Sequence, residues 1–252
     1  MSAGSADGRA WAVLFDLDGL LVDSEPAWFA VEREVFARLE ATRPWTPADQ
    51  HRLVGGSIDA SAQAMVRWAG SGRPPEDVVG WLVAGMAARM REGVAFKPGA
   101  RELLMGVRAA GAATALVSSS HRVLVDAVLH RLPAGSFQAT VAGDEVARGK
   151  PAPDPYARAL SLLGLPASVA VVLEDSPTGA RAGSAAGCAV VVVPDQPVLP
   201  DGHPWVQRDS LRDVTPGMLR GLLGLVGGDG SEHVQTGRAP GGQDRGEHTD
   251  DR

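Results

Sequence analysis

The chain of 252 residues is 44% hydrophobic and 21% charged, and its formal net charge is −6 at pH 7. This length can bury one substantial core and a small insertion, and the acidic balance argues against a surface that binds nucleic acid or an anionic membrane. The single cysteine, Cys188, excludes an internal disulfide and a cysteine-based metal cluster, and its small apolar neighbours predict a buried core position.

The N-terminal part of the chain is predicted to contain one strand followed only by helices. Residues 1–9 are small and polar, and we expect them to be disordered. The apolar run Val13–Phe15 predicts a buried strand. Between residues 26 and 96 apolar side chains recur at three- and four-residue steps, as in Ile58–Ala69 and Val78–Met90, and this spacing indicates helices.

From residue 97 onward, helical patterns alternate with short apolar runs. The predicted strands are Ala113–Val117, Thr140–Ala142, Val169–Leu173 and Ala189–Val193, and the predicted helices are Arg101–Ala110, Val123–Arg131, Asp154–Leu163 and Pro177–Ala186. Such continuous apolar strands suit a parallel sheet that is buried on both faces.

These patterns predict an α/β fold with a core domain and an insertion. We expect residues 10–24 and 97–226 to form a Rossmann-like parallel sheet with helices on both faces, and residues 25–96 to form an inserted α-helical domain. Residues 227–252 carry few large apolar side chains, and we expect a disordered tail there.

Two aspartates follow the first strand directly. Residues two apart on an extended chain point the same way, so Asp16 and Asp18 converge at the carboxyl end of the strand. Two carboxylates on an apolar strand are costly to desolvate unless a cation neutralises them, and such a site suits Mg²⁺. One aspartate can then act as a nucleophile while its neighbour exchanges protons. The alternative is that both only cap turns.

Further polar groups follow the later strands, at the edge where an α/β sheet binds its ligands. Ser118, Ser119 and Ser120 precede a helix, and their hydroxyl and backbone N–H groups form a phosphate site, although one of them is also expected to cap that helix. Lys150 stands in a Pro-rich frame, where its ammonium group can neutralise a phosphoryl group, or else is a solvated surface lysine.

A second acidic pair, Glu174 and Asp175, ends the apolar strand that begins at Val169. We expect the next residue, Ser176, to cap the following helix. Capping by Asp175 is the alternative explanation of this pair, but it does not account for two carboxylates beside so apolar a strand.

These four segments, in this order, resemble the four motifs of the haloacid dehalogenase-like superfamily of phosphatases and phosphomutases. The resemblance covers roughly residues 12–193. Within the superfamily, the sequence resembles more specifically the branch in which a helical cap is inserted after the first motif. The resemblance implies that Asp16 attacks phosphorus to form an aspartyl-phosphate, while Asp18 protonates the leaving oxygen and later deprotonates the attacking water. It further implies that Ser118 and Ser119, with Lys150, bind the phosphoryl group. The magnesium ligands it implies are Asp16, the backbone carbonyl of Asp18, Asp175, and Glu174 either directly or through water.

The cap bears on whether the enzyme is a hydrolase or a mutase. Beta-phosphoglucomutases of this branch use an arginine just after a Gly-x-Ser turn of the cap and a histidine in the first cap helix. Here the turn reads Gly55, Gly56 and Ser57 followed by isoleucine, and Trp28 stands at the histidine position. We expect this turn to face the substrate and contribute to specificity, the alternative being a flexible link between helices.

We therefore expect a Mg²⁺-dependent phosphatase that acts on a small phosphate monoester, such as a sugar phosphate. A phosphomutase, in which His51, Arg52 or Arg67 compensates for the missing residues, and a catalytically idle binding protein are the alternatives. The expected partner is a small phosphorylated metabolite, with neither nucleic acid nor membrane, and the expected state is a monomer or weak dimer. Nothing resembles a signal peptide or a membrane span, so we expect a soluble, cytoplasmic protein.

Overall fold

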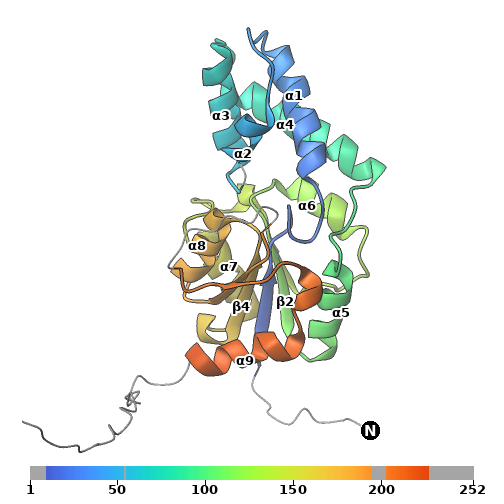
Figure 1. The fold of residues 1–252 in the computed structure, drawn as a ribbon, viewed down its shortest axis with the longest axis vertical. Coiled ribbons are helices and arrows are strands. Elements are labelled where there is room, and N and C mark those ends of the chain that lie inside the picture. The colour runs from blue at the N-terminus through green and yellow to red at the C-terminus, as the bar shows by residue number, and fades with distance from the viewer. Residues whose placement is uncertain (1–9, 54, 195–202, 227–252) are drawn as a thin grey trace, which may run out of the picture.

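The core of the molecule is a six-stranded sheet in which all neighbouring strands are parallel (Figure 1). The computed structural model describes residues 10–53, 55–194 and 203–226, so the two tails that we expected to be disordered, residues 1–9 and 227–252, lie outside the described residues. The spatial order of the strands is β3-β2-β1-β4-β5-β6. Their bounds are β1 Ala12–Phe15, β2 Ala113–Val117, β3 Ala139–Val141, β4 Ala170–Glu174, β5 Ala189–Val192 and β6 Val206–Gln207.

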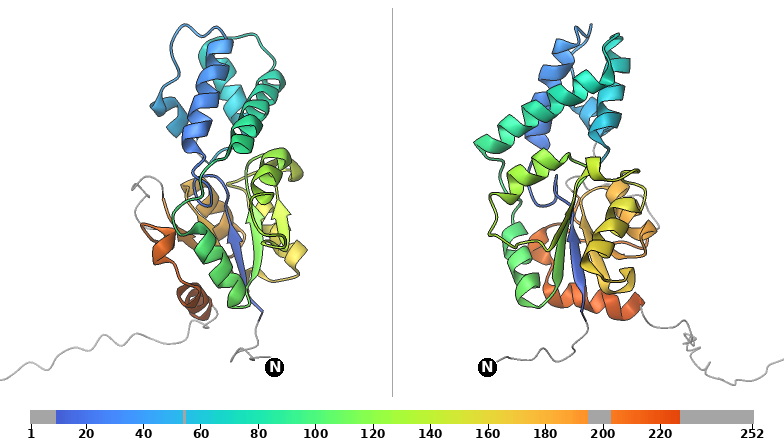
Figure 2. Two further views of the ribbon diagram at one scale, coloured as in Figure 1. Left: turned by 90° about the vertical axis from the view of Figure 1, so that its right-hand side faces the viewer. Right: turned by 180° about the vertical axis from the view of Figure 1, so that it is seen from behind.

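Helices cover both faces of this sheet (Figure 2). One face packs against α5 (Ala100–Ala109), α6 (Arg122–Leu129) and α9 (Pro216–Val226), and the other against α7 (Asp154–Leu163) and α8 (Pro177–Ala185). Short 3-10 turns at Gly143–Glu145, Ala167–Val169 and Leu211–Asp213 complete the core.

The central strand β1 explains why the strands read as continuous apolar runs. Ala12 and Leu14 contribute to the hydrophobic cluster on one face, whereas Val13 and Phe15 contribute to the cluster on the other, and all four side chains are fully buried. A strand whose two faces are both covered has no position for a polar residue until it ends. The α/β fold with a Rossmann-like parallel sheet, expected from the sequence, is confirmed.

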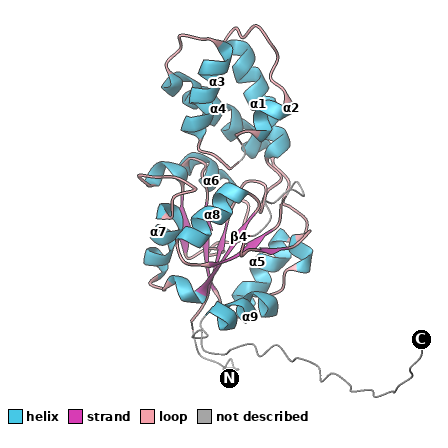
Figure 3. Ribbon diagram, turned by 60° about the vertical axis from the view of Figure 1, so that its left-hand side comes forward, coloured by secondary structure: helices cyan, strands magenta, loops and turns pink. Residues whose placement is uncertain are grey.

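Four further helices form a separate layer beyond the carboxyl end of the sheet (Figures 1 and 3). They are α1 (Glu25–Arg38), α2 (Pro47–His51), α3 (Ile58–Ala69) and α4 (Pro75–Glu92), and together we call them the cap. Their apolar faces meet one another in a common interior, where Phe36, Met65 and Leu82 are almost completely buried. The cap is thus a helical insertion whose apolar interior continues into the hydrophobic cluster on one face of the sheet.

Two chain segments that run side by side join the cap to the sheet. The backbone N–H of Asp23 donates to the carbonyl of Ala95 at 2.8 Å, and that of Lys97 donates to the carbonyl of Leu21 at 2.9 Å. These hydrogen bonds pair the outgoing and returning segments, so any motion of the cap must bend both together. None of the described helices is long and apolar enough to cross a membrane.

The sequence pattern missed three elements. α2 has one and a half turns, too few for apolar periodicity, and a capping box between Thr46 and Asp49 begins it. We predicted no element in the region of β6, which has two residues, or of α9, whose sequence contains three glycines. For a segment this short or this rich in glycine, packing on the core decides the conformation.

The interior of the cap also holds a buried carboxylic acid. Glu32, on α1, is 5% exposed, and its Oε2 accepts a hydrogen bond of 3.1 Å from the indole Nε1 of Trp45. Burial raises the pKa of Glu32 from 4.5 to about 8; the Trp45 hydrogen bond opposes this shift and the charge of Glu25 adds to it. Burial therefore favours the protonated form of Glu32.

The packing of α4 against α1 gives a first prediction, because two glycines of α4 differ in their surroundings. A Cβ atom at Gly85 would lie 2.7 Å from Cγ1 of Val31, whereas a Cβ atom at Gly80 meets nothing within 4 Å. Gly80→Ala should raise the free energy of unfolding by roughly 0.5–1 kcal/mol through helix propensity. Gly85→Ala should lower it, because Val31 is stiff and must move. Equal effects in denaturant titrations of the two variants would contradict this packing.

The raised pKa of Glu32 gives a second prediction. Between pH 4.5 and about 8 the folded chain holds a proton on Glu32 that the unfolded chain has released, so folding stability falls as pH rises through this window. Glu32→Gln keeps the shape and does not titrate. As pH rises through this window, the free energy of unfolding of the variant should increase relative to that of the wild type by up to about 1.4 kcal/mol per pH unit. Denaturant titrations from pH 5 to pH 9 measure the difference, and a flat difference would contradict the assignment.

Candidate active site

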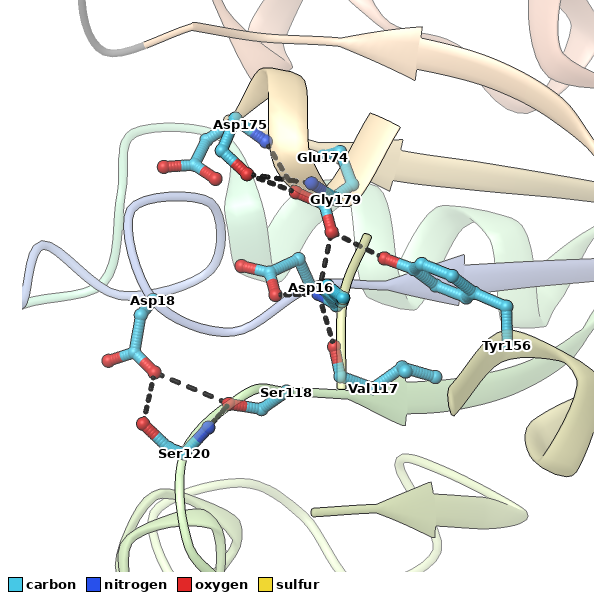
Figure 4. A network of polar contacts seen from close by, with 11 residues as sticks. Asp16, Asp18, Val117, Ser118, Ser120, Tyr156, Glu174, Asp175 and Gly179 are labelled. Atoms are coloured by element: carbon cyan, nitrogen blue, oxygen red, sulfur yellow. Dashed lines mark hydrogen bonds and ion pairs between the residues drawn. The ribbon is translucent and has the colours of Figure 1, made fainter. Parts of the chain in front are cut away.

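The ends of three neighbouring strands bring the sequence-predicted groups together. Asp16 follows β1, and its backbone N–H still bonds to the carbonyl of Leu173 on β4 at 3.0 Å. Ser118 follows β2, on the other side of β1, and Glu174 ends β4. The connection from β1 leads to β2 on one side, whereas the connection from β3 crosses to β4 on the other side of β1, and such a switch point is where open α/β sheets form their binding crevice. Figure 4 shows these groups converging.

The ammonium group of Lys150 lies at the centre of this convergence. Its Nζ is 2.5 Å from Oδ1 of Asp16, 2.6 Å from Oε1 of Glu174 and 3.0 Å from the carbonyl oxygen of Val117. Its side chain is 3% exposed, so the alternative of a solvated surface lysine is wrong. Lys150 therefore connects the ends of β1, β2 and β4 at the cavity.

Glu174 is held by donors on both of its carboxylate oxygens. Oε1 accepts from Lys150 and, at 2.5 Å, from the hydroxyl of Tyr156, while Oε2 accepts from the Ser176 hydroxyl at 3.2 Å and from the backbone N–H of Asp175 at 3.3 Å. A carboxylate offers about four lone-pair positions. Hydrogen-bond donors of the protein occupy these positions on Glu174, so this carboxylate is fixed and can orient Lys150.

The close approach of α8 to Glu174 depends on a glycine. A Cβ atom at Gly179 would lie 1.8 Å from Oε1 of Glu174, so no other residue fits without displacing the carboxylate. Ser176 caps the same helix, as predicted, and accepts a hydrogen bond of 3.1 Å from the backbone N–H of Gly179. Thus the first turn of α8 packs directly on the acidic group.

Asp175 lies in a different environment. Its carboxylate lines the cavity and receives no hydrogen bond from the described part of the chain. It packs against Gly19, which has φ of +80°, and a Cβ atom there would lie 2.1 Å from Oδ2 of Asp175. Only glycine tolerates both the backbone conformation and this contact. Oxygens of Asp16, Glu174 and Asp175 lie within 4.8 Å of one another.

Burial in this cluster perturbs the pKa values of Asp16, Asp175 and Lys150. It raises the pKa of Asp16 to about 8; Lys150 opposes the shift and Glu174 adds to it. Burial, with the charges of Asp16 and Glu174, raises the pKa of Asp175 well above its ordinary range. Burial disfavours the charged form of Lys150, but Asp16 and Glu174 outweigh this and hold its pKa above the ordinary value. One ammonium faces three carboxylates, and the excess negative charge calls for another cation.

The donor set fits a hard divalent cation. Carboxylate oxygens at one end of the cavity, with no nitrogen or sulfur ligand among the described residues of the cluster, match the preference of Mg²⁺. Asp16 and Asp175 present oxygens toward the cavity, whereas the oxygens of Glu174 are already bonded. This geometry favours contact of Glu174 with the ion through water.

Asp18 points away from the acidic cluster into a set of neutral donors. Its Oδ1 accepts from the hydroxyl of Ser24 at 2.7 Å and from the indole Nε1 of Trp28 at 3.3 Å. Its Oδ2 accepts from the hydroxyl of Ser120 at 2.8 Å and from that of Ser118 at 3.3 Å. Asp16 and Asp18 do converge on one cavity, but different partners orient them: an ammonium group for Asp16 and hydroxyl and indole groups for Asp18.

The serines after β2 do not cap the following helix, and our expectation that one of them would is wrong. The N-cap residue of α6 is His121, which makes no side-chain cap hydrogen bond, and the carboxylate of Asp144 accepts from the backbone N–H of Arg122 at 2.9 Å instead. The hydroxyls of Ser118 and Ser120 face Asp18, and Ser119 lines the cavity. The local sequence contains nothing that could reveal a cap supplied by Asp144.

The cap closes the cavity from the opposite side. Gly55 and Gly56 line it, and a Cβ atom at Gly55, whose φ is +76°, would lie 2.8 Å from the hydroxyl oxygen of Ser176. The turn therefore touches the core beside the acidic cluster. Ser57 has another role, since its hydroxyl accepts from the backbone N–H of Ala60 at 3.2 Å and caps α3.

Several residues of the site escaped sequence reasoning. The sequence pattern gives Tyr156 no role and marks Trp28 only as a departure from the mutases, yet Tyr156 bonds to Glu174 and Trp28 bonds to Asp18. Glu32 and Gln50 line the cavity from the cap, and nothing in their local pattern marks them. Both residues belong to helices whose placement over the sheet is a tertiary property.

Comparisons with known proteins agree with this geometry. The family model described as haloacid dehalogenase-like hydrolase matches residues 13–193. Protein CbbY of Rhodobacter capsulatus is 33% identical in an alignment of 194 residues that covers 73% of this chain and 86% of that protein. Hexitol phosphatase A of Escherichia coli K12 is 34% identical in an alignment of 189 residues that covers 73% of this chain and 83% of that protein.

The fold agrees with a solved relative as well. The crystal structure of CbbY from Rhodobacter sphaeroides in complex with phosphate superposes with a TM-score of 0.72 at 28% identity, and the match covers 81% of this chain and 96% of that one. The family model spans the first strand, the cap and the sheet through β5, including all the motifs that form the cavity. The chain therefore belongs to the haloacid dehalogenase-like hydrolases.

Proposed function

We propose that this enzyme is a Mg²⁺-dependent phosphatase that hydrolyses a small phosphate monoester, such as a sugar phosphate, through an aspartyl-phosphate on Asp16. The observation that carries the proposal is the separation of the two aspartates, with Asp16 held by Lys150 and Asp18 held by hydroxyl and indole donors at the same cavity. A nucleophile and a proton carrier need different environments of this kind.

The residues of the chain can perform the first step as follows. Lys150 holds Oδ1 of Asp16, and Oδ2 receives no hydrogen bond from the described residues, so this oxygen can attack phosphorus. The bond between phosphorus and the ester oxygen breaks, and Asp18 delivers its proton to the departing alkoxide. Ser118, Ser119 and Lys150 bind the phosphoryl oxygens.

Hydrolysis then returns the site to its starting state. Asp18 takes a proton from a water molecule, whose oxygen attacks phosphorus, and the bond between phosphorus and Oδ2 of Asp16 breaks. Inorganic phosphate leaves and the carboxylate is restored. Mg²⁺, held by Asp16, Asp175, the backbone carbonyl of Asp18 and, through water, Glu174, would neutralise charge on the phosphoryl group.

The phosphatase is preferred to the phosphomutase because of the cap. A mutase must bind a second phosphate of its intermediate, but the residues that could compensate for the missing arginine and histidine, His51, Arg52 and Arg67, are exposed and do not line the cavity. Trp28, at the histidine position, bonds to Asp18 instead. The catalytically idle alternative has no support, since every motif residue is present and oriented. The solved relative that contains phosphate is consistent with a phosphoryl site in this fold.

The assignment of the nucleophile gives a third prediction. Asp16→Asn should lower phosphate release by about three orders of magnitude or more, because an amide is a far poorer nucleophile. Its fold should persist, since the amide oxygen can still accept from Lys150. Phosphate release is measured on a small aryl ester in Mg²⁺, with Asp77→Asn, an exposed cap variant, as the control that keeps activity. Substantial turnover by a folded Asp16→Asn variant would contradict the mechanism.

The donor set for the metal gives a fourth prediction. Chelation should abolish turnover and Mg²⁺ should restore it, whereas Ca²⁺, which takes more ligands at longer distances, should inhibit. Mg²⁺ should also raise the midpoint of thermal unfolding of the wild type, because it binds the folded state. In Asp175→Asn this shift should be lost or much reduced, while Asp77→Asn should retain it. Full activity in chelator, or an unchanged thermal shift in Asp175→Asn, would overturn the metal assignment.

A further inference from the structure

The cap side of the cavity carries acidic and neutral groups but no cation. The described residues that line the cavity from the cap are Glu25, Trp28, Glu32, Gln50, Leu53, Gly55, Gly56, Ile58 and Ser61. The one cation in the described lining is Lys150, which lies on the core side and is engaged with Asp16 and Glu174. The part of the substrate beyond the phosphate therefore meets no positive side chain.

Glu32 is the buried polar group of this surface. It is 5% exposed, and only one of its oxygens is used, since Oε2 accepts from Trp45 while Oε1 has no hydrogen-bond partner among the described residues. Burial favours the protonated form of this carboxyl, whose pKa it raises to about 8. A protonated carboxyl both donates and accepts, which suits a hydroxyl group.

Gln50 provides a second neutral group at the same wall. Its Nε2 donates to the backbone carbonyl of Glu25 at 2.9 Å, which fixes α2 against the first turn of α1. Its amide oxygen accepts no hydrogen bond from the described residues and is available to a hydroxyl group. The indole of Trp28 adds an apolar surface beside these groups, held in place by its hydrogen bond to Asp18.

We propose that the leaving group is an uncharged polyhydroxy alcohol, a sugar or polyol, with a hydroxyl bound by Glu32 and Gln50. The proposal rests on the proposed phosphatase function and assigns Glu32 as a specificity-determining residue. A second phosphate or a carboxylate on the leaving group would be desolvated beside Glu25 without a cation to compensate it, and the cap would reject it. Specificity for hydroxyl groups follows because a buried polar group left unpaired is costly.

A matched pair of substrates tests the charge preference. Glucitol 6-phosphate and 6-phosphogluconate share a six-carbon chain and differ at the far end, where one has a hydroxymethyl group and the other a carboxylate. The value of kcat/KM should be at least about tenfold higher for glucitol 6-phosphate. Equal values, or a preference for 6-phosphogluconate, would overturn the proposal. So would a higher kcat/KM for glucosamine 6-phosphate than for glucose 6-phosphate, because it would show selection of an ammonium group.

Variants of Glu32 test the assignment of the residue. Glu32→Leu should raise KM for glucitol 6-phosphate about tenfold and change kcat less, with a smaller effect on para-nitrophenyl phosphate, which lacks the hydroxyl groups. Glu32→Gln, which also donates and accepts, should stay within about threefold of the wild type. Glu34→Gln, two residues along α1 and in an exposed ion pair with Arg89, is the matched control that should change neither substrate. Equal losses on both substrates in Glu32→Leu would show a merely structural role and overturn the assignment.

The two proposals can fail separately. If Glu32→Leu does not fold, as judged by circular dichroism, Glu32→Gln and the substrate pairs still decide the matter. Absence of phosphate release from para-nitrophenyl phosphate in Mg²⁺ would overturn the phosphatase function itself. Release from that ester without preference for glucitol 6-phosphate over 6-phosphogluconate would overturn only the assignment of the leaving group.

Discussion

The contact of the Lys150 ammonium group with Asp16 and Glu174 is the interaction on which the site depends. It joins the ends of β1 and β4 and also takes the carbonyl of Val117 at the end of β2. Three buried carboxylates within 4.8 Å of one another would repel strongly without it. The contact also leaves one oxygen of Asp16 unbonded, so the same ammonium group that stabilises the strand ends orients the proposed nucleophile.

The acidic side chains of the site are held in place by different parts of the molecule. Glu174 is held by the core, through the hydroxyl of Tyr156 and the first turn of α8, which approaches closely because Gly179 has no side chain. Asp18 is held by both parts of the molecule, because the hydroxyls of Ser118 and Ser120 belong to the core and the indole of Trp28 belongs to the first cap helix. The orientation of the proposed proton carrier is therefore sensitive to the position of the cap, whereas the proposed nucleophile, Asp16, is held by Lys150 of the core. Such a division suits an enzyme whose cap must exclude water in one step and admit it in the next.

The cap and the core contribute different kinds of residues to the cavity. The four helices of the cap share an apolar interior, and the cap meets the core through the packing of α4 on α6, through two paired segments and through the turn at Gly55. The residues that it adds to the cavity are acidic, neutral or apolar, while the groups proposed to bind phosphate belong to the core.

The sequence by itself determined the α/β fold and the principal groups of the site, because these depend on local patterns. Apolar runs mark strands that are buried on both faces, and a carboxylate at the end of such a run has few explanations other than chemistry. Only the tertiary structure decided that Glu174 orients Lys150, that the serines after β2 face Asp18 and not the next helix, and that Glu32 lines the cavity. The reason is physical: Ser120 and Asp18 are 102 residues apart and meet only when the strands align. Short elements such as α2 and β6 likewise gain their conformation from the surfaces on which they pack.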